Sequence, residues 1–170
     1  MLKVDLAKLG REDSLALDER VPAEAELWRE TGPKFEGPLI VELQVRSTAS
    51  GQVLVQGRLA GRVLQQCRRC LEGITLELDR EVYFVFAPSN ELEVEPGDEV
   101  YELPTRAREL DLTSAVREEV VLTTPVYGVC REGCRGLCPR CGQNWNENDC
   151  DCALEEPDPR WDALRALNEE

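Results

Sequence analysis

Eight cysteines and no histidine constrain this chain more than any other feature of its 170 residues. Six of the cysteines lie between positions 130 and 152, and all eight fall in close pairs. Two cysteines separated by two residues can curl a single turn around a metal ion. We therefore expect distant parts of the chain to converge on metal ions. The four pairs are Cys67 with Cys70, Cys130 with Cys134, Cys138 with Cys141, and Cys150 with Cys152.

The compartment and the spacing indicate which chemistry the cysteines serve. The start of the chain has no apolar run of signal-peptide length, and no stretch reaches about 18 uninterrupted apolar residues, so we expect a cytoplasmic protein without membrane contact. Cytosolic thiols stay reduced, which favours metal ligation over disulfides. Ferredoxin-type spacing is absent, and Cys67–Cys70 precedes a strand-like segment rather than the helix of a thioredoxin-type centre. The sequence predicts two structural zinc ions, each held by four cysteines.

The sequence leaves the grouping of the pairs open. Proximity favours one site from the 138/141 and 150/152 pairs, which leaves 67/70 to join 130/134 across about 60 residues. The other grouping joins 130/134 with 138/141 and 67/70 with 150/152. The first arrangement would tie the middle of the chain to its C-terminal segment, which should stabilise the fold because it closes a long loop.

Alternating apolar residues predict an antiparallel sheet between residues 38 and 87. Three strands are expected there, and the second is either continuous or broken near Gly57 and Gly61. A helix should span about 112–123, with Asp111 or Thr113 as its N-cap, and end before Pro125. The first strand would carry Leu39, Val41, Leu43 and Val45 on one face. The third strand would continue the alternation through Ile74, Leu76, Leu78, Val82, Phe84 and Phe86.

The predicted fold class is α+β: an antiparallel, partly closed β-sheet with one or two short helices and a C-terminal zinc-ribbon-like module. Residues 1–125 would form the mixed α+β domain, in which residues 1–35 contribute only a short strand at 2–6. Residues 126–170 would form the cysteine-rich module, packed on the first part through the 67/70 pair. An acidic loop is expected between Pro88 and Val100, and a second helix after Asp158.

The residue types argue against catalysis. No histidine is present to act as a general acid or base, and no glycine-rich phosphate loop or nucleophile elbow occurs. A zinc ion held by four cysteines has no open position for water. We therefore expect a protein that binds a macromolecule, with no small-molecule substrate.

Charge suggests two classes of partner. The formal net charge is -14, so any contact with a phosphate backbone must be local. Arginines cluster around the cysteines and could pair with phosphate. The equally weighted alternative is that they neutralise the thiolate sites, and the acidic stretches could instead bind a basic protein. The candidate contact residues are Arg58, Arg62, Arg68, Arg69, Arg131, Arg135 and Arg140.

Four blocks in order resemble the YceD family of large ribosomal RNA subunit accumulation proteins. They are CRRCLE from Cys67, ELDLTSAVREEVVLTTP from Glu109, CREGCRGLCPRCGQNWNENDCDC from Cys130, and DPRWDALRAL from Asp158. The resemblance implies a bacterial, non-enzymatic factor for 23S rRNA accumulation and large-subunit assembly. Its partner would be 23S rRNA or its precursor, or a basic ribosomal protein; an RNA-processing enzyme is a further alternative. Trp145 departs from the family pattern, where a smaller aliphatic residue is expected.

Overall fold

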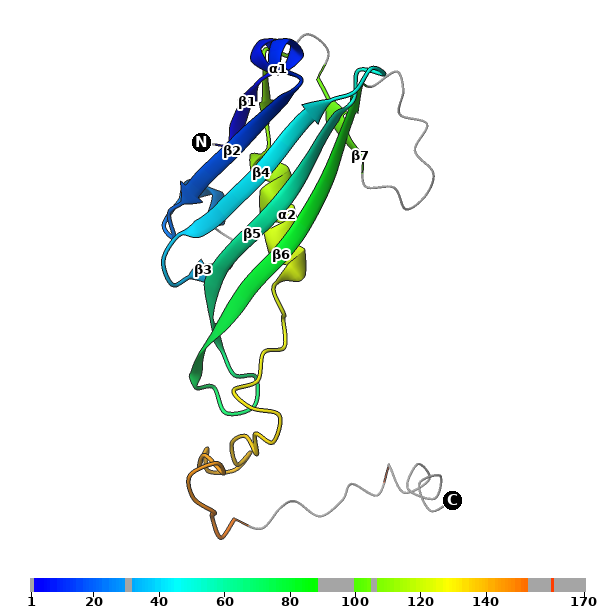
Figure 1. The fold of residues 1–170 in the computed structure, drawn as a ribbon. Helices are drawn as coiled ribbons and strands as arrows, with labels where there is room; N and C mark the ends of the chain where they lie inside the picture. Colours follow the sequence, from blue (N-terminus) through cyan, green and yellow to red (C-terminus); the bar gives the residue numbers. More distant parts are fainter. Residues whose placement is uncertain (1, 30–31, 89–99, 105–106, 153–159, 161–170) are drawn as a thin grey trace.

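The computed structural model describes residues 2–29, 32–88, 100–104, 107–152 and 160. The chain begins with β1 (Lys3–Asp5), α1 (Leu6–Glu12), β2 (Ser14–Val21) and a 3-10 turn, η1 (Glu26–Trp28). It continues through β3 (Lys34–Phe35), β4 (Leu39–Ser47), β5 (Val53–Gln66), β6 (Gly73–Pro88), β7 (Val100–Leu103), β8 (Glu109–Asp111) and α2 (Thr113–Thr123). These elements confirm the α+β class, and the segment that carries six of the eight cysteines follows α2 at one end of the molecule (Figure 1).

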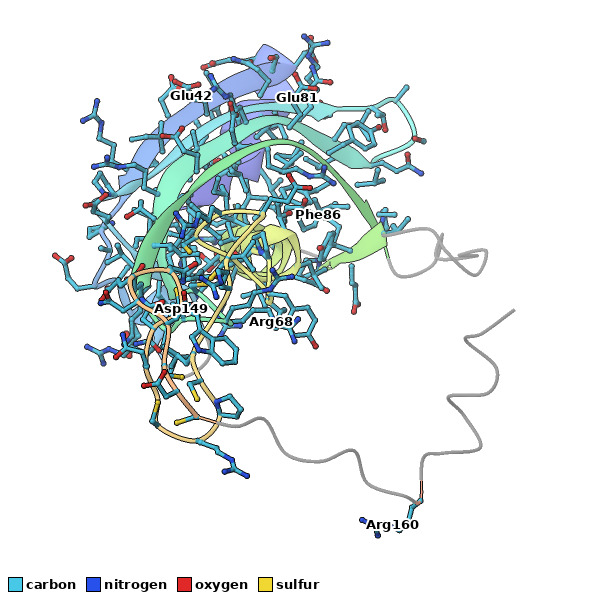
Figure 2. All side chains as sticks on the ribbon, turned by 90° about the horizontal axis from the view of Figure 1, so that it is seen from below. Glu42, Arg68, Glu81, Phe86, Asp149 and Arg160 are labelled. Atoms are coloured by element: carbon cyan, nitrogen blue, oxygen red, sulfur yellow. The ribbon has the colours of Figure 1, made fainter. Side chains whose placement is uncertain are left out.

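A single sheet forms most of the fold. Its strand order is β2-β4-β5-β6-β7, and β3 pairs with the end of β5. The predicted antiparallel meander of β4, β5 and β6 is confirmed, and the β5–β6 pairing is continuous from Val53↔Phe86 to Gln66↔Gly73. The strands curve around α2 and partly enclose it (Figure 2). Because β5 and β6 are long, their connecting turn lies well beyond the end of β4.

β5 is one continuous strand through both of its glycines. Gly57 lies opposite Leu43 of β4, and a Cβ added at this glycine would be 2.0 Å from the carbonyl oxygen of Glu42. The glycine is therefore required because two backbones approach closely, and no strand break results.

The core lies between the inner face of the sheet and α2. The alternating residues of β4 are buried as predicted, and α2 adds Ala115, Val116 and Val120 to the same cluster. The helix matches the predicted span of 112–123 within one residue, and the Asp111 carboxylate accepts the Thr113 N–H at 2.9 Å. The Arg80–Glu119 ion pair, at 3.0 Å, joins β6 to α2 at the edge of this core.

Three features differ from the sequence predictions. β2 is a full strand paired to β4 over Ser14↔Arg46 to Val21↔Leu39, where no long element was expected. The segment around residues 2–6 is a strand only to Asp5 and then becomes α1, because the Asp5 carboxylate caps the helix by accepting the Lys8 N–H. β7 pairs parallel to β6, so the sheet is antiparallel everywhere except at this edge.

Some predictions concern residues outside the described part of the chain. The acidic loop between residues 88 and 100 and the helix expected after position 158 belong to this group. Among the described helices, none has the length and apolar character needed to cross a bilayer.

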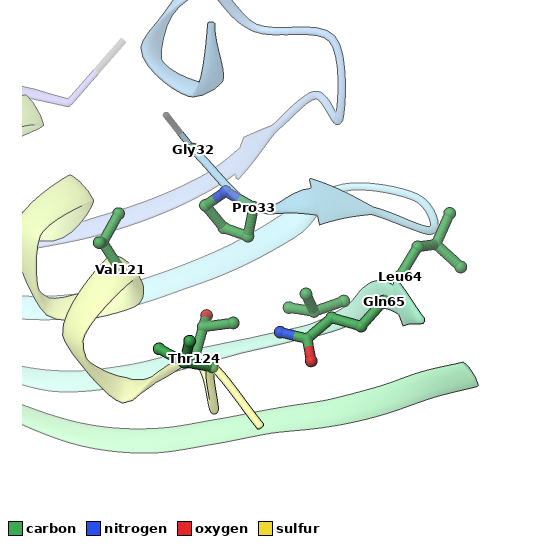
Figure 3. A pocket seen from close by; sticks show the side chains of 8 residues that line it. Gly32, Pro33, Leu64, Gln65, Val121 and Thr124 are labelled. Atoms are coloured by element: carbon green, nitrogen blue, oxygen red, sulfur yellow. The ribbon is translucent and has the colours of Figure 1, made fainter. Parts of the chain in front are cut away.

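A shallow apolar hollow of about 210 Å³ lies where α2 meets the ends of β3 and β5 (Figure 3). Pro33, Leu64, Gln65 and Val121 are among the residues that line it. The Gln65 side chain donates to the Pro125 carbonyl at 2.8 Å, which fixes the path of the chain as it leaves α2 for the cysteines.

Candidate metal centres beyond the end of the sheet

The structure brings the eight cysteines together in two groups of four. Group A, as we call it, contains Cys67, Cys70, Cys130 and Cys134; group B contains Cys138, Cys141, Cys150 and Cys152. Within each group all sulfur atoms lie within 4.8 Å of one another. This is the grouping that sequence proximity favoured, and the alternative grouping does not form.

The sulfur–sulfur distances in group A suit a tetrahedral ion. Cys67 Sγ lies 3.7 Å from Cys134 Sγ, and Cys70 Sγ lies 3.7 Å from Cys130 Sγ. Four sulfurs at about 2.3 Å from a central zinc ion are about 3.8 Å apart, whereas disulfide sulfurs are about 2.05 Å apart. All eight cysteines are free thiols. The donor set therefore fits a metal ion and leaves no place in the tetrahedron for water.

Group A begins in the turn that joins β5 to β6. The Cys67 N–H donates to the Glu72 carbonyl at 2.8 Å, and the Leu71 N–H donates back to the Cys67 carbonyl at 2.8 Å. These bonds close a compact turn of residues 67–72, which we call knuckle A. Leu71 has φ 62, in the left-handed region that glycine normally occupies, and its side chain is 57% exposed.

Group B contains a second turn with the same backbone bonds. The Cys138 N–H donates to the Gln143 carbonyl at 2.8 Å, and the Gly142 N–H donates to the Cys138 carbonyl at 2.9 Å. We call residues 138–143 knuckle B. Its left-handed position is Gly142, with φ 74, so this turn is formed without a strained side-chain residue.

Backbone bonds attach the C-terminal segment to knuckle A. The Arg68 N–H donates to the Gly128 carbonyl at 3.0 Å, and the Leu137 N–H donates to the Arg69 carbonyl at 3.1 Å. The guanidinium of Arg69 donates to the carbonyls of Glu132 and Cys134 at 3.2 and 3.0 Å. Arg69 therefore holds the loop that carries the other two cysteines of group A.

The thiols of group A have opposed pKa shifts. Burial raises the pKa of Cys67, but the N–H groups of Cys70, Cys130 and Arg69 donate to its sulfur and bring the net pKa to about 6. The Glu72 N–H lowers the pKa of Cys70, yet burial and the neighbouring thiols dominate and raise it to about 12. Four adjacent thiols cannot all ionise without a cation, whereas a bound divalent ion removes that restriction.

Group B repeats this contrast. The peptide N–H groups of Cys141 and Arg140 act against burial and lower the pKa of Cys138 to about 6. The adjacent Cys141 thiol, together with burial and the thiol of Cys138, raises the pKa of Cys152 to about 12. Each group thus holds one thiol whose pKa is lowered by peptide N–H groups and one whose pKa is raised by burial and neighbouring thiols.

The seven candidate arginines do not share one surface. Arg58 lies in the middle of β5, about 30 Å from Cys67 along the strand, and is paired with Asp79 at 2.6 Å. Arg62 pairs with Glu36 at 3.0 Å. The expectation that all seven gather around the metal region therefore fails for Arg58, because an extended strand separates it from the cysteines.

The other five arginines lie on or between the knuckles, and they differ in their partners. Arg131 donates to the Asn146 side chain at 2.9 Å, and Arg135 pairs with Asp149 at 2.5 Å. The guanidinium of Arg68 lies 4.2 Å from the ring centroid of Tyr127. Within the described residues, no carboxylate pairs with Arg68 or Arg140.

Sequence reasoning missed three side chains at this site. Tyr127 is 68% exposed beside Arg68. Trp145 and Asn146 donate to cysteine sulfurs at 3.3 and 3.4 Å. No periodicity could have identified them, although the position of Trp145 and Asn146 between two cysteine pairs is a weak signal that the sequence did contain.

Comparison with known proteins gives a consistent picture. Residues 55–168 match the family described as "Large ribosomal RNA subunit accumulation protein YceD". An uncharacterized protein of Mycobacterium tuberculosis is 31% identical over 168 residues, which covers 96% of this chain and 79% of that protein. The "Large ribosomal RNA subunit accumulation protein YCED homolog 1, chloroplastic" of Arabidopsis thaliana is 34% identical over 67 residues, or 39% of this chain and 21% of that protein. No solved structure matches.

Proposed function

The chain belongs to the YceD family, and from that premise we propose that it is a non-enzymatic factor of large ribosomal subunit assembly. It would act in the cytoplasm, contain two structural zinc ions and bind 23S rRNA or its precursor through the surface around knuckle A. The observation that carries this proposal is the exposed pair of Arg68, in knuckle A, and Tyr127, in the segment after α2, next to the four sulfurs of group A.

Zinc is the ion that best suits these sites. Every ligand is a thiolate, the sulfurs are arranged as a tetrahedron requires, and the ion needs no open position. Held in this way, the ions stabilise the fold and supply no Lewis acid to a substrate. The function then depends on the surface that the ions support.

Arg68 and Tyr127 present two kinds of RNA contact next to each other. An arginine fork pairs with phosphate, and an exposed aromatic ring accepts a stacked base. Arg68 has no competing carboxylate among the described residues, and its backbone is bonded to Gly128, directly after Tyr127. Arg140 on knuckle B supplies a second cation that pairs with no carboxylate in the described part of the chain. Because the protein as a whole is acidic, such a cluster is the part of it to which a phosphate backbone is attracted.

Filter binding of 23S rRNA fragments tests the proposal. The affinity of the native protein should fall steeply between 50 and 200 mM salt, as expected for a few phosphate contacts. Arg68→Glu should weaken binding about tenfold, and Tyr127→Ala about fivefold, because stacking on one base is lost. Arg46→Glu is the matched control, since it reverses an exposed arginine near the opposite end of the sheet and should change affinity less than twofold.

The outcomes separate clearly. Selective loss in Arg68→Glu and Tyr127→Ala, with normal metal content, supports RNA binding through knuckle A. Affinity that does not depend on salt, or equal losses in Arg68→Glu and Arg46→Glu, rejects it.

A second candidate function rests on the outer face of the sheet. Glu42 of β4 and Glu81 of β6 point outward there (Figure 2), and both are paired in register with Arg58 of β5, which lies between them. Asp18 of β2 pairs with Glu42 and extends the row to the edge of the sheet. This acidic row could bind a basic ribosomal protein. A pulldown from cells treated with nuclease distinguishes the two candidates: a ribosomal protein that stays bound favours the acidic row, and a partner lost with the RNA favours knuckle A.

A further inference from the structure

Two adjacent residues lie between the two cysteine groups. They belong to the loop of residues 142–149, which joins Cys141 to Cys150. The Trp145 indole N–H donates to Cys150 Sγ of group B at 3.3 Å. The Asn146 side-chain N–H donates to Cys134 Sγ of group A at 3.4 Å. One dipeptide of the group B loop therefore hydrogen-bonds to a sulfur in each group.

The orientation of the Asn146 amide is fixed by its other partners. Its Oδ1 accepts the Arg135 N–H at 2.9 Å and an Arg131 guanidinium N–H at 2.9 Å. With two donors on the oxygen, the NH2 end must point toward Cys134. The Asn144 Oδ1 accepts both the backbone and the side-chain N–H of Asn146, at 3.0 and 2.7 Å. The donor is thus positioned by the folded loop.

The loop in turn depends on group B. Its two ends are Cys141 and Cys150, both members of that group. Its start is closed by the Cys138–Gln143 backbone bond at 2.8 Å, and the Trp145 N–H donates to the Gly136 carbonyl at 2.9 Å. An ion held by Cys141 and Cys150 fixes both ends, whereas removal of the ion releases them.

We propose that Trp145 and Asn146 couple the two metal sites, so that an ion in group B holds Asn146 against Cys134 and slows release of the ion in group A. This inference rests on one part of the proposed function, namely that group A and group B each hold a metal ion. An N–H···S bond offsets the negative charge of a four-thiolate site, and outer-sphere partners of this kind change metal affinity about 10- to 100-fold. A smaller aliphatic residue at position 145 would have no such donor, so the contact to group B depends on the indole of Trp145.

Release of Zn²⁺ to a chromophoric chelator tests the coupling. Asn146→Asp keeps the acceptor oxygen for Arg131 and Arg135, removes the donor, and places a charge beside Cys134. It should speed release from group A about tenfold. Asn148→Asp is the matched control, because it makes the same change at an exposed loop position whose side chain has no bond to a sulfur among the described residues. Its release rates should stay within twofold of native.

A double-variant comparison isolates the coupling itself. Cys150→Ser with Cys152→Ser removes the group B site, and the one remaining ion, in group A, should be released about tenfold faster than in the native protein. Adding Asn146→Asp to that background should change the rate less than twofold, because Asn146 is no longer held at Cys134. Far-UV circular dichroism checks that the sheet persists in each variant.

Each result decides the question. Native release of the group A ion in the Cys150→Ser, Cys152→Ser variant, or additive effects of the two changes, overturns the coupling and leaves the proposed metal content and RNA binding intact. A native chain that holds fewer than two Zn²⁺ ions overturns the metal assignment and the coupling with it. If the cysteine variant loses its sheet, the test rests on the rates of Zn²⁺ release from the Asn146→Asp and Asn148→Asp single variants. Equal release rates in those two variants reject the coupling.

Discussion

Knuckles A and B have the same pair of backbone hydrogen bonds in different surroundings. Knuckle A continues directly from β5 into β6, and its cysteines are among the most buried residues of the protein, with Cys67 at 0% and Cys70 at 4% exposure. Knuckle B lies outside the sheet, and of its two cysteines Cys138 is buried whereas Cys141 is exposed. The comparison teaches that one local turn serves two purposes: in knuckle A it joins the C-terminal segment to the sheet, and in knuckle B it organises a loop.

The residue in the left-handed position shows the same contrast. Knuckle B uses Gly142, which occupies that conformation without strain, whereas knuckle A uses Leu71 with most of its side chain in solvent. A left-handed conformation costs an ordinary residue about 1–2 kcal/mol. Leu71 therefore adopts a strained conformation although its side chain is not buried within the protein. A partner can cover this exposed side chain, which lies beside the proposed RNA contact.

The largest expected difference between the knuckles is in thermal stability. Cys67→Ser should lower Tm by about 10 °C or more and the zinc content from two to one, because it opens a link across about 60 residues. Cys150→Ser should lower Tm by only about 3–5 °C, since group B joins residues close in sequence. Thermal circular dichroism with metal analysis measures both. Equal losses of Tm in the two variants would contradict the distinction drawn here.

A smaller effect is expected when the left-handed residues are exchanged. Gly142→Leu should destabilise the protein by about 1–2 kcal/mol, because it introduces the strain that Leu71 already bears. Leu71→Gly should be neutral or stabilising by up to about 1 kcal/mol. Glycine relieves the strain of the left-handed conformation in the folded state, but it also raises the conformational entropy of the unfolded chain, which offsets part of that gain. Urea unfolding of the zinc-loaded protein measures both changes. If Leu71→Gly is clearly destabilising, the leucine is packed in solution and the strain argument is wrong.

The smallest effect concerns one surface ion pair from each region. Asp79→Asn in the sheet and Asp149→Asn in the group B loop should each change Tm by less than about 2 °C at pH 7. The bond from Arg58 lowers the pKa of Asp79, so the pair stabilises the fold above the carboxylate's unfolded pKa of about 4 and ceases to do so as pH falls through the lower folded value. The Tm difference between native and Asp79→Asn should therefore shrink as pH falls below about 4 and vanish once the folded carboxylate is protonated. A difference that grows with acidity would contradict this sign.

Much of the fold could be predicted because its signals are local. The alternation in β4 and β6 and the spacing of α2 each depend on neighbours in sequence. β2 was missed because it is an edge strand whose inward residues are only half buried, and Glu19 interrupts their apolar pattern. The parallel pairing of β7 could not be predicted, since β7 has only four residues and its direction relative to β6 has no signal in the local sequence.

The candidate site was predictable in its ligands and much less so in its neighbours. Metal chemistry limits which residue types can form a four-sulfur site, so cysteine spacing alone indicated the favoured grouping. The donors Trp145 and Asn146 are residue types with many possible roles, and only the fold brings them to the sulfurs. For the same reason Arg58 looked like a member of the cluster in the sequence, although an extended strand carries it away.

The position of knuckle A within a hairpin also has a consequence for synthesis of the chain. Cys70 is translated 60 residues before Cys130. The turn therefore leaves the exit tunnel with two of the four cysteines of group A, and the other two follow only after α2 has emerged. The four thiols of group A can therefore come together only after every element of the sheet has been synthesised.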